Sequence, residues 1–237
     1  MNPLTKLYVA AVLGLGAMAL GSITPQDVPS PALALTWLAA MTVVSLFKLR
    51  LPLQRGNATM SMAYVIDFIV IVTAGVDLAM IVAASGVLVQ CTARVRRRQP
   101  WYRTAFSIAT VALAVKTAGL IWSGLGGSIA QPGIASTAVP LACAVAAYFA
   151  VNTGLVLGAI VFSSGAGSRR ASTYFVRTAP AFLVAAGTAV VMQILVSREA
   201  YLFLPGALTP ILVCYFAYGA WFRRVADSNS AAAPAMT

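Results

Sequence analysis

The sequence contains no histidine, only three cysteines and only five acidic residues among its 237. Without histidine, the chain has no His-ligated haem, no His-containing zinc site and no histidine general base. The cysteines show no CxxC spacing, so we expect them to be small apolar packing residues. A glycine-rich phosphate loop with lysine, an HExxH motif and a Ser-His-Asp set are also missing. We therefore expect no cofactor, no metal site and no enzymatic activity.

Charge of either sign is scarce, since 9% of the residues are charged and 60% are hydrophobic. This composition excludes an ordinary soluble domain. The connections between the hydrophobic runs are short, so we predict one bundle over residues 1–226. Residues 227–237 lack apolar periodicity, and we predict a disordered tail there. The predicted membrane spans are 4–22, 31–47, 60–76, 77–93, 104–124, 134–162, 178–197 and 201–222.

The basic residues are placed unequally around these runs. With the N-terminus inside, fourteen of the sixteen fall on the cytoplasmic side, whereas Arg198 lies outside and Lys116 lies within a span. Lys/Arg bias in short loops sets the orientation of membrane proteins. The sequence thus predicts an all-α polytopic bundle of about eight transmembrane helices, with both termini cytoplasmic, in a bacterial inner membrane. The first run also has features of a secretory signal, and we expect it to be retained.

The densest basic cluster is the predicted cytoplasmic loop 94–103. Basic loops attract anionic lipid headgroups, and aromatic rings at a helix end suit the headgroup layer. We expect the lipid bilayer and its headgroups, and not nucleic acid, to be the partner of these charges, because the chain has no compact basic module. The residues predicted at this interface are Arg96, Arg97, Arg98, Trp101, Tyr102 and Arg103.

Two ionisable residues fall near the middle of predicted spans. Asp67 lies halfway along 60–76, and Lys116 lies just past the middle of 104–124. A charge at mid-bilayer costs roughly 2.5–3.5 kcal/mol on insertion scales, so each needs a partner or a purpose. Our hypothesis is that Asp67 and Lys116 form a buried ion pair bordering a polar cavity. The alternatives are a purely structural pair, or a Lys116 that extends along its stem to the membrane surface.

Four further polar residues are candidates for a ligand site or polar core. Ser61 and Tyr64 precede Asp67 at spacings that put all three near one helix face. Asn152 and Thr153 lie near the middle of 134–162, where hydrogen bonding between helices is the common use of such residues. We group all four with Asp67 and Lys116 as candidates for a ligand-binding site or a polar core.

From about residue 51 onward the sequence resembles the multi-span sensory region that precedes HD-GYP and GGDEF domains in bacterial cyclic-di-GMP signalling proteins. The stretches that carry the resemblance are LPLQRGNATMSMAYVIDFIVIVTAG, RRRQPWYRTAFSIATVALA, AYFAVNTGLVLGAIVFSSG and the last span leading to AYGAWFRRVADS. The resemblance implies interest in Pro52, Ser61, Trp101, Tyr102, Phe149, Asn152 and Thr153. Two departures are that no output domain follows Arg224 within this sequence and that Ser107 stands where the family has asparagine.

Three functional hypotheses follow. The first is a non-enzymatic sensory or ligand-binding membrane module, which the resemblance favours. The second is a small-molecule transporter or its substrate-binding subunit, favoured by the mid-bilayer charges and by a weak repeat of Arg-Thr-Ala at Arg103 and Arg177. The third is a structural subunit of a larger complex, with a membrane protein partner or a second copy of the chain covering an apolar face.

Overall fold

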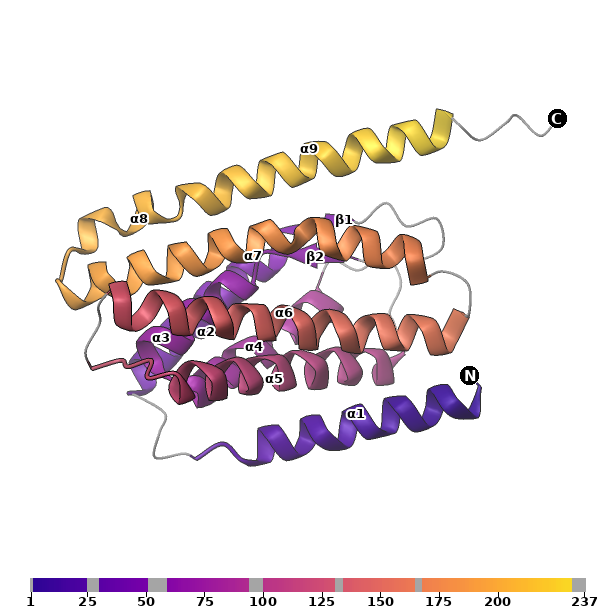
Figure 1. The fold of residues 1–237 in the computed structure, drawn as a ribbon, viewed down its shortest axis with the longest axis horizontal. Coiled ribbons are helices and arrows are strands. Elements are labelled where there is room, and N and C mark those ends of the chain that lie inside the picture. Colours follow the sequence, from indigo (N-terminus) through magenta and orange to yellow (C-terminus); the bar gives the residue numbers. More distant parts are fainter. Residues whose placement is uncertain are drawn as a thin grey trace.

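The structure, a computed structural model, describes residues 2–24, 30–50, 59–93, 100–130, 134–164 and 168–231. It is a bundle of helices, most of which lie along one direction (Figure 1). The long helices are α1 (Pro3–Gly21), α5 (Trp101–Gly124), α6 (Ile134–Ser164), α7 (Ser168–Ser197) and α9 (Thr209–Ala231). The shorter elements are α2 (Pro31–Leu46), β1 (Lys48–Arg50), β2 (Thr59–Ser61), α3 (Tyr64–Ala74), α4 (Val76–Thr92), η2 (Tyr201–Phe203) and α8 (Leu204–Ala207).

Five helical segments are long and apolar enough to cross a membrane. They are α1, α5, most of α6, most of α7, and the segment Leu204–Val225, which covers α8 and most of α9. Large apolar side chains such as Leu7, Met18, Leu183 and Phe216 lie exposed on these helices. Side chains of this kind find a matching environment in lipid and not in water. The chain is therefore a helical membrane protein.

The short helix α3 forms the centre of the bundle. Every residue from Tyr64 to Val72 is buried, although α3 has only 11 residues. It packs against α4 and α7, and less extensively against α2. Gly75 ends it with a φ of 95°, a left-handed conformation that glycine adopts without strain, and α4 begins at the next residue. The sharp turn lets two consecutive helices lie against each other.

The predicted span 60–76 is not one continuous helix. Its first residues belong to β2, which pairs antiparallel with β1 so that Lys48 faces Ser61, Leu49 faces Met60 and Arg50 faces Thr59. The pairing also replaces part of the predicted loop after the second span. Backbone groups buried away from water need hydrogen-bond partners, and strand pairing supplies them where the helix has not yet begun. Pro52 lies outside the described residues.

The directions of the helices alternate along the chain. Helices α1, α3, α5 and α7 run one way, whereas α2, α4, α6 and α9 run the other way. The contacts that fix these directions are Thr5–Phe162 and Tyr8–Leu155 between α1 and α6, Tyr64–Phe182 and Val72–Gln193 between α3 and α7, Val76–Gly119 between α4 and α5, Tyr8–Phe106 and Gly16–Ala109 between α1 and α5, Val44–Ser61 between the ends of α2 and β2, and Arg177–Tyr218 between α7 and α9.

Several helix boundaries differ from those expected. Helix α7 begins at Ser168, ten residues before the predicted span 178–197. Helix α9 continues to Ala231, beyond residue 226 where the sequence predicts the bundle to end. The apolar run marks only the part of a helix that suits lipid, and the helical backbone extends past it into polar sequence. Residues 232–237 lie outside the described residues.

Candidate functional site

Asp67 is the most deeply buried ionisable residue that the structure describes. It lies in the first turn of α3 and is 2% exposed. The hydroxyl of Tyr148, on α6, donates a hydrogen bond to its Oδ2 atom at 2.9 Å. Its Oδ1 atom has no hydrogen-bond partner within the part of the chain that the structure describes. Half of this carboxyl group is thus satisfied, and the other half is an open acceptor inside the bundle.

The Tyr148 ring that bonds to this carboxyl group belongs to a network of aromatic rings. The ring of Phe182, on α7, stacks on Tyr64 with centroids 4.0 Å apart and planes 12° apart. Phe68 meets Tyr148 edge-to-face at 5.0 Å, and Phe149 meets Phe182 edge-to-face at 5.1 Å. Helices α3, α6 and α7 each contribute to the cluster. We call Tyr64, Asp67, Phe68, Tyr148, Phe149 and Phe182 the aromatic cluster.

The electrostatics of the aromatic cluster are unbalanced. The described residues place no lysine or arginine in a salt bridge with Asp67. The start of α3 supplies a partial positive charge, because the first N–H groups of a helix point out of it. That interaction is worth at most about 2 kcal/mol, whereas the effective penalty for burying an ion is several kcal/mol. The carboxyl group therefore costs folding stability where it lies.

The hypothesis that Asp67 pairs with Lys116 is wrong. The Nζ atom of Lys116 lies 3.8 Å from Oδ1 of Asp77, which is at the start of α4, and the backbone N–H of Thr24 donates to Oδ2 of Asp77 at 3.0 Å. The reason is geometric. Helix α5 ends at Gly124, as the predicted span does, and it brings Lys116 level with the Gly75 turn and the start of α4. Asp67 lies two turns away from that turn, near the beginning of α3.

A double-mutant cycle distinguishes the two pairings. We expect Asp77→Asn and Lys116→Gln to show a coupling of about 0.5 kcal/mol in the free energy of unfolding, since both side chains are partly exposed. Asp67→Asn and Lys116→Gln should be additive within about 0.3 kcal/mol. The measurement is reversible unfolding in bicelles. A coupling between positions 67 and 116 that exceeds the one between 77 and 116 would restore the original pairing.

The other predicted site residues are only partly brought together. Tyr64 belongs to the aromatic cluster, and its hydroxyl donates to Sδ of Met62 at 2.8 Å. Ser61 lies outside the cluster, and its hydroxyl donates to the carbonyl of Val44 at 3.4 Å and so ties β2 to α2. Asn152 and Thr153 lie one turn beyond Tyr148 on α6, where neither bonds to Asp67 or Lys116.

The basic cluster predicted at the membrane interface is described only at its end. Trp101 begins α5 and is 78% exposed, with Tyr102 half-buried and Arg103 exposed beside it. That these residues lie in the headgroup layer stays a prediction. Arg96, Arg97 and Arg98 lie outside the described residues.

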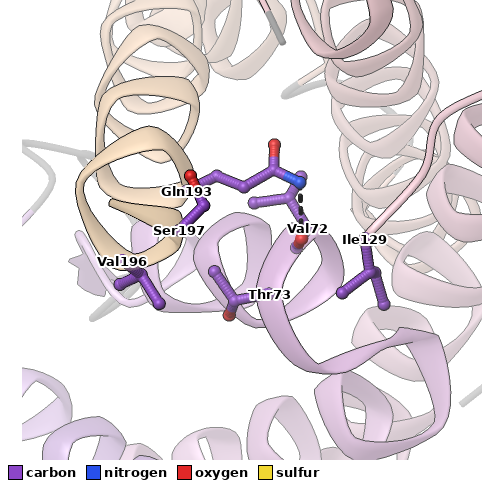
Figure 2. A pocket seen from close by; sticks show the side chains of 6 residues that line it. All are labelled: Val72, Thr73, Ile129, Gln193, Val196 and Ser197. Atoms are coloured by element: carbon purple, nitrogen blue, oxygen red, sulfur yellow. Dashed lines mark hydrogen bonds between the residues drawn. The ribbon is translucent and has the colours of Figure 1, made fainter. Parts of the chain in front are cut away.

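A second polar group, which the sequence did not single out as a site, lies at the other end of α3. Gln193 on α7 is 3% exposed, and its Nε2 atom donates to the carbonyl oxygens of Val72 at 3.0 Å and Ser128 at 3.1 Å. Figure 2 shows the side chain reaching across from α7 to α3. It thereby caps one of the last carbonyls of α3, which have no partner within the helix. The signal in the sequence for this polar group is a glutamine within an apolar helix. The acceptor that the amide reaches cannot be predicted from that signal, because it depends on where α3 ends.

Among the residues that the structure describes, no three His, Cys, Asp or Glu side chains come close enough to hold a metal ion. Comparison with family models, with curated proteins and with solved structures finds no match to this chain.

Proposed function

We propose that the chain is a non-enzymatic membrane module that binds a ligand or senses a condition at the aromatic cluster. The observation that carries this proposal is the Oδ1 atom of Asp67, an unpartnered acceptor in a buried aromatic setting. Ionisable residues inside membrane bundles are costly, and their usual purpose is to bind, relay or switch. A ligand with a cationic or hydrogen-bond-donating group would satisfy this atom. Because this atom is buried, access to it requires the helices around it to separate.

The proposal includes an eight-span arrangement in a bacterial inner membrane, with both termini cytoplasmic. The alternating helix directions support it, and so does the distribution of charge. Lys6, Arg103, Arg223 and Arg224 belong to the end of the bundle where α1 and α5 begin and α9 ends. In this arrangement β2 and α3 together form the third crossing, and α2 and α4, with 16 and 17 residues, cross with the help of flanking residues.

A contiguous set of contacts leads from the aromatic cluster to the last helix and supports a sensory role. Phe182 is the member of the cluster on α7, and Arg177 lies about one turn before it on the same helix. The guanidinium of Arg177 lies 5.7 Å from the ring centroid of Trp221 on α9, and the hydroxyl of Tyr218 donates to the Arg177 carbonyl at 3.0 Å. A displacement of α7 at the cluster would therefore shift α9, which is the output element in this proposal.

Two alternative functions are each supported by a separate observation. Transport is favoured by the interrupted third crossing, because broken helices at mid-membrane are typical of transporter substrate sites. A structural subunit is favoured by the dense packing of α3, where Phe68, Val70 and Ile71 are fully buried. Native mass spectrometry separates ligand binding from a purely structural role of Asp67.

The test is native mass spectrometry of the protein extracted gently from its own membrane. We expect wild type to retain a small molecule that Asp67→Asn loses. Asp77→Asn is the matched control, because it removes an equivalent charge at the α4 start and should leave the bound mass unchanged. Retention of the same mass by Asp67→Asn, or retention of partner proteins without any small molecule, would overturn the proposal in favour of a site elsewhere or of a structural subunit.

A further inference from the structure

The surroundings of the Asp67 carboxyl group bear on whether it carries a charge. Its Oδ2 atom accepts the hydrogen bond from Tyr148, whereas Oδ1 is buried and has no partner within the described residues. A carboxylate offers about four lone-pair sites to donors, and here a single donor is present. Because Oδ1 is buried, the smallest species that it can hold without any movement of the helices is a proton.

The backbone donors at the start of α3 do not make up for the missing partner. The N–H of Val65 donates to the Met62 carbonyl at 3.1 Å. The N–H groups of Ile66 and Asp67 donate to the Ala63 carbonyl at 2.9 Å and 3.3 Å. A helix start stabilises an anion chiefly through N–H groups that have no other partner. At α3 these three N–H groups bond to carbonyl oxygens instead of to the carboxyl group.

The elements packed against α3 do not supply a cation either. No lysine or arginine in the described part of the chain forms a salt bridge with Asp67. On α7 the charged residue nearest in sequence to the aromatic cluster is Arg177, which lies against Trp221 of α9. On α4 it is Asp77, which pairs with Lys116, and α2 has no titratable residue. The titratable groups that remain near the cluster are phenols and a thiol, which are uncharged at neutral pH: Tyr64, Tyr148, Tyr218 and Cys214.

The neutral acid fits this setting better than the carboxylate does. Burying an ion without a charged partner costs far more than burying a neutral hydroxyl without a hydrogen bond. The bond from Tyr148 and the dipole of α3 offset only part of the cost of the ion. In the neutral acid, Oδ2 is the carbonyl oxygen that accepts from Tyr148, and Oδ1 carries the proton.

We propose that Asp67 is a proton-binding site, which holds a proton while the aromatic cluster is packed as described and releases it when the surrounding helices separate. The inference rests on the proposed function, because ligand access requires the same separation, and it adds regulation of that site by pH. On opening, the O–H bond at Oδ1 breaks, its electron pair stays on the carboxylate, and the proton passes to water. Closing reverses this step. A rising pH therefore favours the open cluster, and a falling pH favours the closed one.

The carboxyl groups can be observed directly, because the sequence contains only four aspartates: Asp27, Asp67, Asp77 and Asp227. The measurement is solid-state NMR in lipid bilayers on protein labelled with ¹³C at the aspartate carboxyl carbon. Detergent exchange beforehand continues until native mass spectrometry shows no retained small molecule. An ordinary aspartate titrates at about 4 and is ionised at neutral pH. We expect one resonance at neutral pH to have the shift of a neutral acid, to vanish in Asp67→Asn and to remain in Asp77→Asn. Four ionised carboxyl groups in wild type would overturn the inference.

The pH dependence of stability is an independent test. The unfolded chain gives up this proton above about pH 4, as an exposed aspartate does, whereas the folded protein keeps it. The folded state then binds one proton more than the unfolded state, so its stability falls as the pH rises. Relative to Asp67→Asn, the folding equilibrium constant of wild type should fall about tenfold per pH unit, until the folded protein also releases the proton. Asp77→Asn should keep this difference from Asp67→Asn. Parallel pH profiles of wild type and Asp67→Asn would contradict the proton site.

Neither measurement uses the ligand of the proposed function, so the two failures are distinguishable. If no carboxyl group is neutral and a small molecule still depends on Asp67 in native mass spectrometry, only the proton-binding inference fails. If Asp67 is neutral and no small molecule depends on it, the ligand-binding proposal fails and the proton site stands.

Discussion

Tyr148→Phe is expected to lower the free energy of unfolding by about 2 kcal/mol, because it removes the only hydrogen bond that the described residues make to the buried carboxyl group of Asp67. The phenylalanine ring keeps the edge-to-face contact with Phe68, so the loss comes from the hydroxyl and not from packing. Tyr8→Phe is the matched control. Its hydroxyl donates to the neutral carbonyl of Leu155 at 2.8 Å in a part-buried position, and its removal should cost about 0.6 kcal/mol.

The same substitution in an Asp67→Ala background tests the cause. Without the carboxyl group, the Tyr148 hydroxyl has lost its acceptor, so its removal should cost close to nothing. Unfolding in bicelles, followed for wild type, both single variants and the double variant, gives the coupling energy. If Tyr148→Phe costs as much in the Asp67→Ala background as in wild type, the hydroxyl stabilises the bundle through some group other than Asp67.

The second large effect is expected at Gly16, where α1 crosses α5. A Cβ atom on Gly16 would overlap both the side chain and the backbone of Ala109. Backbone cannot move aside as a flexible side chain does, so Gly16→Leu must push the two helices apart. Separation would also break the hydrogen bonds from Thr5 to the Phe162 carbonyl and from Tyr8 to the Leu155 carbonyl. We expect a loss of about 3 kcal/mol in the free energy of unfolding.

Gly14→Leu is the control for this prediction. Gly14 lies on the same helix, and no atom of the described residues comes within 4 Å of the position that its Cβ would take. Leucine there should face lipid, and the free energy of unfolding should change by less than about 0.5 kcal/mol. Equal destabilisation by the two leucines would mean that α1 responds to leucine in general and does not depend on close packing against Ala109.

The class of protein could be predicted from the sequence, because it depends on composition. Runs of apolar residues such as 104–124 and 178–197 fall within helices long enough to cross a membrane. The burial of Asp67 was also predictable, since an acidic residue inside an apolar run has to be sheltered. Both predictions need only the position of a residue along its own segment.

The partners of Asp67 could not be predicted in this way. Hydropathy gives the depth of a residue but not the neighbours of its helix, and α3 packs chiefly against α7 and α4, with Tyr148 of α6 reaching its first turn. The apolar run 60–76 also conceals the change from strand to helix at Ser61–Tyr64, because both structures suit the same residues. That change moves Asp67 from the expected middle of a span to the first turn of a short helix.

The sequence analysis missed Phe68, Phe182 and Tyr148, and Tyr148 is the one of these three that carries a polar group. It stands in the stretch AYFAVNTG, where Asn152 and Thr153 drew attention by their amide and hydroxyl groups. A tyrosine hydroxyl in an apolar helix needs a partner as much as an asparagine does, and that requirement was the available signal. Which acceptor it meets depends on the packing of α3 against α6.

The shortness of α3 has a consequence for how the protein is made. An 11-residue helix is about 16 Å long, roughly half of the hydrocarbon thickness of a bilayer, so lipid alone cannot hold it across the membrane. The elements that hold it are made at different times. Helix α4 follows it directly, but Gln193, which caps its last turn, is synthesised 121 residues after Val72. Until α7 emerges, the central helix lacks one of its two principal packing partners, so the middle of the molecule is among the last parts to be completed.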